Sequence, residues 1–225
     1  MAQLGVRRLT VPLRPLAEFS AADWFGDVGD LGPAGFESYA RVLHPWREGA
    51  DGTERIDGHL PEDELAALCD VLGRHTSTAE HCFFALWDGY GEIYGGESVA
   101  FLTTFAGPAP WPGRLFGKPK PKEPPPPAFA AAVLDGPRLV VGSRDYLLFA
   151  GPLAHAGLWG AAAYGVGVPR DLNSPNLFWP DDHTWFVTTD IEGSWSGVGG
   201  SEALITDLLA EPRLEVVRAR HEVAQ

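Results

Sequence analysis

The residues best suited to chemistry lie in a hairpin near the C-terminal end of the chain. If Glu192-Gly193 is a two-residue turn, Asp190 stands opposite Trp195, and the two side chains share one face of the hairpin. A carboxylate beside an aromatic ring can bind a cation, a sugar or the arginine of a partner protein. This pair is therefore the sharpest prediction of a binding site.

Two glycines shape the same face. In the same register Gly197 stands opposite Thr188, and Gly199 stands opposite Phe186. Positions without side chains leave room for a ligand or for another backbone to approach. The simpler alternative, which we favour, is that a helix packs on the glycines and that Asp190 caps a local turn.

Two neighbouring motifs could hold an ion. Asp181-Asp182-His183 has the side chains of a metal site, but the spacings of known metal motifs are absent. After Trp179-Pro180, the triplet is more simply interpreted as a turn. The segment Gly197–Ser201 joins a strand to a helix and could bind an anion, although Ser201 is better explained as the N-cap of that helix.

Nucleophilic catalysis has weaker support. The serines of the segment 193–197 are one position away from a G-x-S-x-G elbow, and Cys82 lies in an apolar run. Cys69 falls on the apolar stripe of a helix, so we expect both cysteines to be buried thiols. The remaining catalytic hypothesis is a hydrolase or lyase that uses Asp190 or His183 as a general base.

Alternation and apolar runs predict the strands that position these residues. We expect strands at 36–43, 81–88, 97–104, 139–141, 146–149, 184–191, 194–199 and 213–218, with the run 81–88 in the centre of the sheet and the run 213–218 at its edge. Residues 46–60 are expected to form a loop.

Helical spacing appears in three places. Pro61 with three acids after it begins a helix that ends at Gly73, a second helix covers 201–210, and an Ala- and Gly-rich short helix covers 153–164. The pattern predicts an α+β fold, a largely antiparallel sheet with two to four helices, in a single domain over 1–225. Proline-rich residues 107–127 are expected to form an exposed loop in that domain.

Composition limits the partners. Seventeen Lys and Arg against 30 Asp and Glu give a net charge of −13, which disfavours nucleic acids and anionic membranes. A basic protein partner suits this charge, although solubility alone also explains it. No apolar run reaches the length of a membrane span, so we expect a cytoplasmic protein that needs no cofactor.

Long strings of this sequence carry a resemblance to a known family. FESYARVLHP, HCFFALWDGYG and NLFWPDDHTWFVTTDIEGSWSGVGGS resemble a family of uncharacterised actinobacterial proteins. The resemblance implies no activity, cofactor or catalytic residue, because none is assigned to the family. In size, acidity and tryptophan-rich strands the chain is also similar to immunity-type proteins of bacterial toxin systems.

The sequence thus favours a non-catalytic acidic module, immunity-like or regulatory, that binds another protein. The alternatives are the small hydrolase or lyase and a small-ligand binder on an aromatic platform. The predicted binding residues are Trp179, Asp181, Asp182, His183, Asp190, Glu192 and Trp195.

Overall fold

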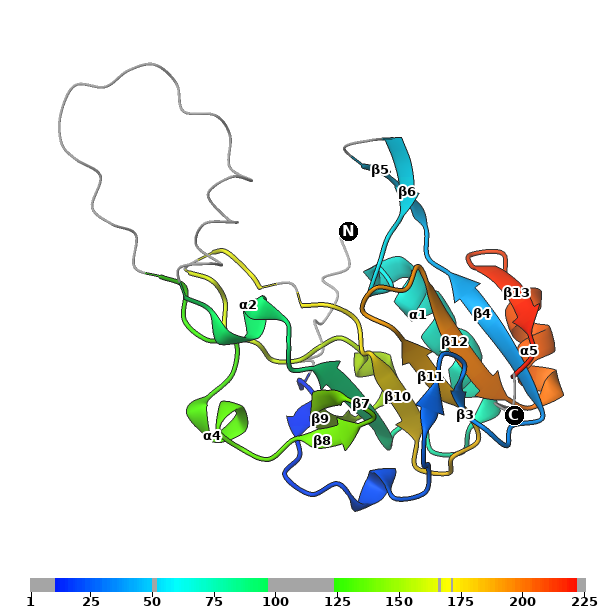
Figure 1. The fold of residues 1–225 in the computed structure, drawn as a ribbon, viewed down its shortest axis with the longest axis horizontal. Coiled ribbons are helices and arrows are strands. Elements are labelled where there is room, and N and C mark those ends of the chain that lie inside the picture. The colour runs from blue at the N-terminus through cyan, green and yellow to red at the C-terminus, as the bar shows by residue number, and fades with distance from the viewer. Residues whose placement is uncertain (1–10, 50–51, 97–123, 166, 171, 222–225) are drawn as a thin grey trace, which may run out of the picture. The chain divides into compact units, whose positions relative to one another are not determined.

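The computed structural model describes residues 11–49, 52–96, 124–165, 167–170 and 172–221 (Figure 1). The chain forms two compact units. Unit 1 comprises residues 1–88, 137–160 and 173–225, and unit 2 comprises 89–136 and 161–172. The expectation of a single domain stays a prediction.

Unit 1 is built on an antiparallel sheet of nine strands in its described part. Along the sheet the order is β1-β9-β7-β10-β11-β12-β4-β13, and β8 pairs with β9 beside this path. These strands are β1 (Arg14–Pro15), β4 (Ser38–Leu43), β7 (Cys82–Trp87), β8 (Leu139–Val141), β9 (Arg144–Gly151), β10 (Leu177–Pro180), β11 (Phe186–Thr189), β12 (Trp195–Gly200) and β13 (Glu215–Ala219). Two short hairpins pair separately: β2 (Val28–Gly29) with β3 (Gly32–Pro33), and β5 (Trp46–Gly49) with β6 (Gly52–Arg55).

Two helices pack on the back of this sheet, the face away from the viewer in Figure 1. They are α1 (Glu62–Leu72) and α5 (Glu202–Leu209), accompanied in unit 1 by the short 3-10 helices η1 (Ser20–Ala22), η2 (Gly73–His75) and η3 (Leu153–His155). Helix α1 follows Pro61, carries acids in its first turn and buries Leu65, Leu68 and Leu72. The predicted α+β fold with a largely antiparallel sheet is therefore confirmed.

The front of the sheet has its own core on the side of β7 to β11. Trp179 on β10 stacks on Phe186 with ring centroids 5.5 Å apart, and Phe83 stacks on Trp179 at 5.7 Å. Phe25, from the N-terminal segment, meets both large rings edge-on. Full burial of side chains of this size stabilises a fold by about 1.5–3 kcal/mol each. The N-terminal segment is thus held over this half of the front face by aromatic packing.

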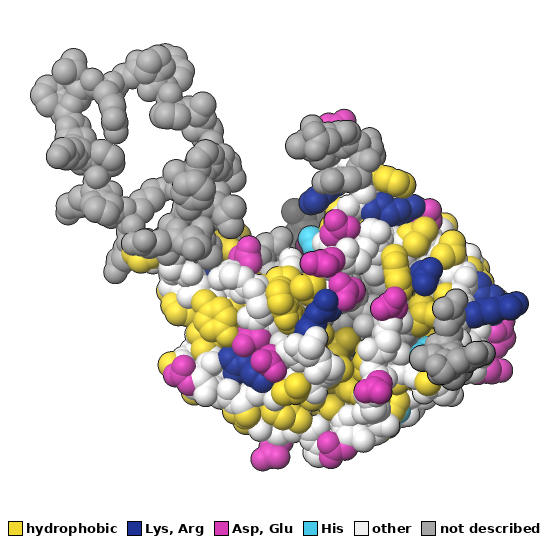
Figure 2. Space-filling view, in the orientation of Figure 1, with side chains coloured by type: hydrophobic (Ala, Val, Ile, Leu, Met, Phe, Trp, Pro, Cys, Tyr) yellow, Lys and Arg dark blue, Asp and Glu magenta, His cyan; other side chains and the backbone are white. Residues whose placement is uncertain are grey.

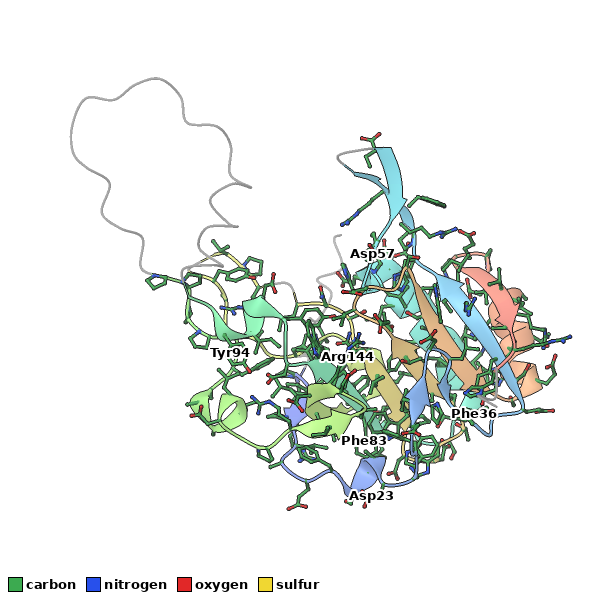
Figure 3. The ribbon with its side chains drawn as sticks, viewed as in Figure 1. Asp23, Phe36, Asp57, Phe83, Tyr94 and Arg144 are labelled. Atoms are coloured by element: carbon green, nitrogen blue, oxygen red, sulfur yellow. The ribbon has the colours of Figure 1, made fainter. Side chains whose placement is uncertain are left out.

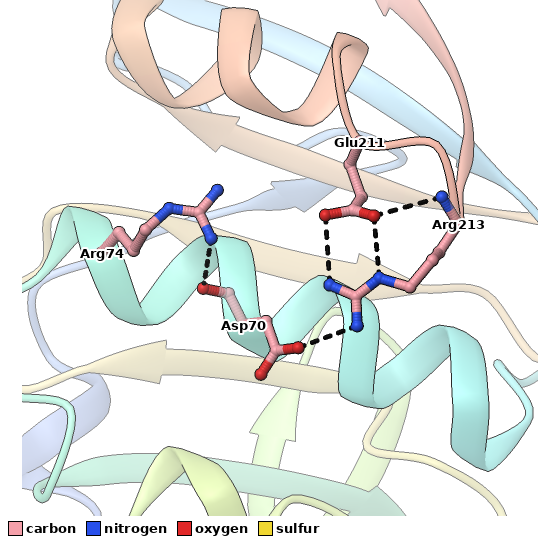
Figure 4. A network of polar contacts seen from close by, with 4 residues as sticks. All are labelled: Asp70, Arg74, Glu211 and Arg213. Atoms are coloured by element: carbon pink, nitrogen blue, oxygen red, sulfur yellow. Dashed lines mark hydrogen bonds and ion pairs between the residues drawn. The ribbon is translucent and has the colours of Figure 1, made fainter.

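Ion pairs on the surface join α1 to the loop after α5 (Figure 4). The guanidinium of Arg213 contacts the carboxylates of Glu211 at 2.8 Å and Asp70 at 2.9 Å, and Arg74 donates to the Asp70 carbonyl at 3.0 Å. The hydrogen bonds from Arg213 lower the pKa of Glu211 to about 2. Exposed pairs of this kind contribute little to stability, so we regard the network as orienting the loop that leads into β13.

Unit 2 contains the short helices α2 (Gly91–Tyr94) and α4 (Ala131–Leu134). Arg170 holds three of its segments together, because its guanidinium donates to the backbone carbonyls of Glu92, Pro126 and Ala162. The same guanidinium lies 4.4 Å from the Tyr164 ring centroid. Residues 124–127 form no regular element, while the predicted strand at 97–104 and the rest of the proline-rich segment lie outside the described residues.

Two expectations about elements were wrong, and one strand was not predicted. The segment 46–60 contains the β5–β6 hairpin rather than a loop. Strand β10, which ends at Trp179-Pro180, was not predicted, whereas the turn expected directly after it forms at Asp181 and Asp182. Of the expected helix at 153–164 only η3 forms. Its glycines explain this, because Gly157 and Gly160 have φ of 82° and 71°, values that interrupt a helix.

Replacing Gly197 by alanine tests the contact between the N-terminal segment and the sheet. An added Cβ would lie 2.4 Å from the Asp30 carbonyl oxygen and 2.7 Å from the Leu31 Cα, so backbone would have to move. We expect Gly197→Ala to lower the free energy of unfolding by about 1–3 kcal/mol, the usual cost of overpacking. Urea unfolding followed by tryptophan fluorescence measures this loss.

The matched control is Gly26→Ala, because an added Cβ at Gly26 meets no atom within 4 Å. We expect this variant to stay within about 0.5 kcal/mol of the wild type. Equal unfolding midpoints for the wild type and Gly197→Ala would show that the backbone contact at Gly197 is not formed.

Candidate functional site

The predicted hairpin forms, and its strands have the predicted register. Thr188 pairs with Gly197 and Thr189 with Ser196. The turn itself begins one residue earlier than expected: the Gly193 N–H donates to the Asp190 carbonyl at 3.0 Å, so Ile191 and Glu192 are its central residues. Asp190 and Trp195 therefore flank the turn as the sequence predicted.

The face with the two glycines is covered by backbone and aromatic packing, and not by a helix. The turn between β2 and β3 places Asp30 and Leu31 against Gly197, and the ring of Phe36 lies against Gly199. Of the two possible occupants of this space, a ligand and another backbone, the structure contains the backbone. The glycines therefore serve a close approach within unit 1.

Asp190 already has partners inside the chain. Its Oδ2 accepts a hydrogen bond from Arg144 Nη1 at 2.6 Å, and its Oδ1 accepts one from the Glu192 N–H at 2.9 Å. Burial by itself would raise the pKa of Asp190, but these two interactions lower it. A carboxylate whose pKa is lowered and whose two oxygens each accept a hydrogen bond is a weak general base, so the role of Asp190 is to cap the turn and pair with Arg144.

Trp195 also carries a cation from its own chain. The guanidinium of Arg41, on the neighbouring strand β4, lies 4.3 Å from the centroid of the Trp195 ring. Both predicted recognition groups thus bind an arginine of the same chain. The adjacent Glu192 has an exposed side chain.

Trp179 does not belong to a binding surface. Its side chain is 0% exposed, in the aromatic core on the front of the sheet, and its Nε1 donates to the Ala21 carbonyl at 3.1 Å. Trp179, one of the predicted binding residues, is buried because β10 lies between β7 and β11 inside the sheet and other aromatic rings pack against it.

Asp182 organises a turn instead of binding a metal. Its carboxylate accepts hydrogen bonds from the Ser77 N–H at 2.7 Å and from the hydroxyls of Thr76, Ser77 and Thr184 at 2.8 Å each. Burial would raise the pKa of Asp182, but these bonds lower it to about 2. Within the described residues no group of three His, Cys, Asp or Glu side chains could hold a metal ion.

His183 lies at the opposite end of β11 from Asp190. It has a φ of 55°, and its ring stacks on Trp24 with centroids 4.3 Å apart. At about 3.3 Å per residue, the extended segment between His183 and Asp190 separates them by roughly 20 Å. The two candidate general bases of the predicted hydrolase or lyase therefore lie too far apart to act together in one site.

Asp181 lines a small surface cavity with a cysteine. The cavity, of about 310 Å³, is also lined by Arg14, His81 and Cys82. Burial, followed by nearby acids, raises the pKa of the Cys82 thiol to about 12, and burial also raises the pKa of Cys69. Both thiols are free and protonated at neutral pH, which excludes them as ready nucleophiles.

A serine–histidine pair escaped the sequence analysis. His44 Nδ1 lies 2.7 Å from the Ile56 carbonyl oxygen, which can only accept, so Nδ1 donates and Nε2 accepts from Ser196 Oγ at 3.0 Å. Ser196 Oγ in turn lies 2.7 Å from Thr189 Oγ1. Burial lowers the pKa of His44, and both His44 and Ser196 are 0% exposed. No substrate can reach this pair, so it fixes strands β4, β11 and β12 to one another.

The start of α5 is likewise satisfied within the chain. Ser201 Oγ accepts from the Leu204 N–H at 3.2 Å, which confirms Ser201 as the N-cap. The Glu202 N–H donates to a carboxylate oxygen of Glu37 at 3.0 Å. The anion that the helix N-terminus attracts is thus supplied by Glu37.

The front of the sheet also carries exposed side chains where β12, β4 and β13 lie side by side. Side chains that share this face are Leu43, Arg41, Trp195 and Val217, because Leu43 pairs with Trp195 and Arg41 pairs with both Gly197 and Val217. Arg41 is exposed and Val217 is 43% exposed, and Figure 2 shows hydrophobic side chains at the surface over these strands. We call these four residues the open sheet face; Arg41 and Val217 are exposed, and Leu43 and Trp195 are partly buried.

Acidic side chains border the open sheet face at one end. The Gly58 N–H donates to the Gly193 carbonyl at 2.9 Å, which brings exposed Asp57 next to the turn that carries exposed Glu192. Figure 3 shows Asp57 near the base of the β5–β6 hairpin. We call Asp57 and Glu192 the acidic rim.

Comparisons with protein-family models, with curated proteins and with solved structures find no match to this chain. The resemblance to an uncharacterised actinobacterial family stays a prediction. Every helix among the described residues falls short of the length and hydrophobicity that crossing a bilayer requires.

Replacing Asp182 by asparagine tests the role assigned to this carboxylate. The pKa of Asp182 in the folded protein, about 2, lies below the unfolded value of about 3.9, so its stabilising effect is complete above pH ~4 and is lost as the pH falls towards 2. We expect Asp182→Asn to cost about 2 kcal/mol at pH 7, since hydrogen bonds to charged groups contribute about 1.5–3 kcal/mol. Urea unfolding from pH 7 to pH 2.5 measures the difference.

The difference between the two proteins should shrink as the pH falls. Asp181→Asn, which changes the exposed neighbour, serves as the control and should match the wild type at every pH. A stability gap for Asp182→Asn that is constant with pH would contradict the ionised hydrogen-bond acceptor described here.

Proposed function

We propose that this chain is a non-catalytic acidic module that binds a basic surface of another protein, as immunity and regulatory proteins do. The observation that carries the proposal is the division of one sheet face into two halves. The chain's own N-terminal segment covers one half, while the open sheet face presents the exposed Arg41 and Val217 beside the partly buried Trp195 and Leu43. Aromatic side chains beside charged rims are typical of protein interfaces.

The interior of the open sheet face supplies apolar area. Trp195 is held in position by Arg41, 4.3 Å from its ring centroid, and Leu43 and Val217 lie on neighbouring strands of the same face. A side chain that is already ordered loses little conformational entropy when a partner covers it. These residues therefore suit the centre of a contact.

The charge of the acidic rim indicates that the partner carries positive charge. Asp57 and Glu192 are exposed, and the whole chain has a net charge of −13. Opposite charge on a partner accelerates association and favours the correct orientation, whereas phosphate-rich nucleic acids and anionic membranes are repelled. The proposed partner is therefore a basic protein in the cytoplasm, and not a nucleic acid or an anionic membrane.

The β5–β6 hairpin extends the same region. Trp46, its first residue, is 59% exposed, and the Arg55 guanidinium lies 4.4 Å from the Trp46 ring centroid. Arg55 Nη2 also donates to both carboxylate oxygens of Glu215 on β13, at 2.8 and 2.9 Å. These contacts anchor the base of the hairpin to strand β13, beside the open sheet face.

Trp195→Ala and Glu192→Lys test the proposal in affinity capture from a cytosolic extract. We expect the wild type to capture one defined protein at low salt, and to lose it as the salt concentration rises, because exposed charges are screened within about 8–10 Å at 0.1–0.15 M salt. Trp195→Ala should weaken binding of the purified captured protein by about 30-fold, the effect of a residue worth 2 kcal/mol. Glu192→Lys should mainly slow association.

Glu80→Lys is the matched control, since it makes the same charge change at an exposed position just before β7, at the other end of the strands. Hydrogen exchange of the purified complex should protect β4, β12 and β13. Capture that is indifferent to Trp195→Ala, or equal losses for Glu192→Lys and Glu80→Lys, would argue against the open sheet face as the contact.

A further inference from the structure

The front of the sheet also has a cavity that is separate from the open sheet face. It is a cavity of about 210 Å³ between two turns of unit 1. Gly29 and Asp30, from the β2–β3 turn, form one wall, and Val141–Arg144, from the β8–β9 turn, form the other. Leu177 and Thr188, which pair across β10 and β11, lie in its floor.

An ion pair stands at one end of this cavity. Arg144 and Asp190 both line it and contact each other at 2.6 Å, with side chains 31% and 45% exposed. The pair uses one of the five N–H groups of the guanidinium, and a second interaction links Arg144 to Tyr146. Further N–H groups of Arg144 and lone pairs of Asp190 remain for hydrogen bonds to a ligand.

The charges at the cavity select against ionic ligands. Arg144 and Asp190 neutralise each other, and Asp30 adds one further negative charge on the opposite wall. An anionic ligand would face two carboxylates, and a cationic group placed beside Asp190 would be repelled by the guanidinium of Arg144. A hydroxyl group avoids both problems, because it can accept from the guanidinium and donate to the carboxylate without separating them.

The size and floor of the cavity define the ligand further. A cavity of about 210 Å³ lies below the roughly 300–1,000 Å³ of most small-molecule pockets, so it suits a ligand about the size of a single sugar ring rather than a nucleotide. The Leu177 side chain offers an apolar contact to ring C–H groups, Thr188 adds a polar group in the floor, and Ser143 adds one in the wall formed by the β8–β9 turn.

We propose that the cavity between the β2–β3 and β8–β9 turns binds a small neutral polyhydroxylated ligand of the monosaccharide class, with adjacent hydroxyls on Arg144 and Asp190. The site differs from the predicted aromatic platform, since the Trp195 ring already carries Arg41. It also differs from the protein contact proposed above, and either can fail without the other.

Titration of the ¹⁵N-labelled full chain with D-glucose, D-galactose and D-mannose tests the proposal. At least one sugar should shift the amide signals of residues 29–30, 142–144 and 188–190 with a dissociation constant near 1 mM, measured up to about 50 mM. Glucose 6-phosphate and glucosamine, which carry opposite charges on the same ring, should bind at least about 10-fold more weakly than the neutral sugar.

Two variants and one control locate the site. Arg144→Met and Asp190→Asn should each weaken sugar binding at least about 10-fold, and Asp190→Asn keeps an oxygen that can accept from the Glu192 N–H. Arg218→Met removes the arginine of another surface ion pair, with Glu202 at 2.7 Å, and should leave binding unchanged. The amide spectrum of each variant shows whether it is folded, and Asp190→Asn remains informative if Arg144→Met is not.

Several results would overturn the proposal. These are the absence of shifts up to about 50 mM of all three sugars, shifts confined to residues outside the cavity, binding of a charged analogue as tight as that of the neutral sugar, or sugar binding that Asp190→Asn leaves unchanged.

Discussion

The close approach of the β2–β3 turn to Gly197 is the contact on which the rest of the front face depends. The Asp30 carbonyl and the Leu31 Cα lie where a Cβ at position 197 would be, so the turn can reach the sheet only over a residue without a side chain. This contact forms the border of the part of the front face that the N-terminal segment covers. On one side of the turn lies the cavity with Arg144 and Asp190, and on the other lies the open sheet face with Trp195.

Arginines of the chain itself satisfy the groups that looked most available in the sequence. Arg144 pairs with Asp190, Arg41 lies on the Trp195 ring, and Arg55 pairs with Glu215. In a chain with a net charge of −13, few cations are present, and these three are placed around one end of the sheet. The same pairing that removes Asp190 as a general base leaves an ordered set of donors and acceptors at the cavity, and it holds Trp195 ready for a partner.

Local patterns predicted much of the architecture. The apolar run of β7 indicated a central strand, and the spacing of Leu65, Leu68 and Leu72 indicated α1. A continuous apolar run is typical of a strand that is buried on both faces, and helical spacing is typical of a helix that is buried on one face. The register of the β11–β12 hairpin was also correct, since Thr188 pairs with Gly197. The β5–β6 hairpin was missed, because its strands are polar and pair only with each other. Strand β10 was missed because it is only four residues long and ends in a proline, and its place in the sheet comes from its neighbours β7 and β11.

For the candidate site, the sequence by itself determined which residues share a face of the hairpin, since side chains alternate along a strand regardless of context. It also determined the excess of acids and the N-cap at Ser201. Only the tertiary structure decided which of these residues meet a partner. Asp182 lies by Ser77, Trp24 by His183, and His44 by Ser196 through contacts between segments far apart in the chain. Such contacts depend on how the sheet is ordered and on what packs over it, and no local pattern of residues encodes that order.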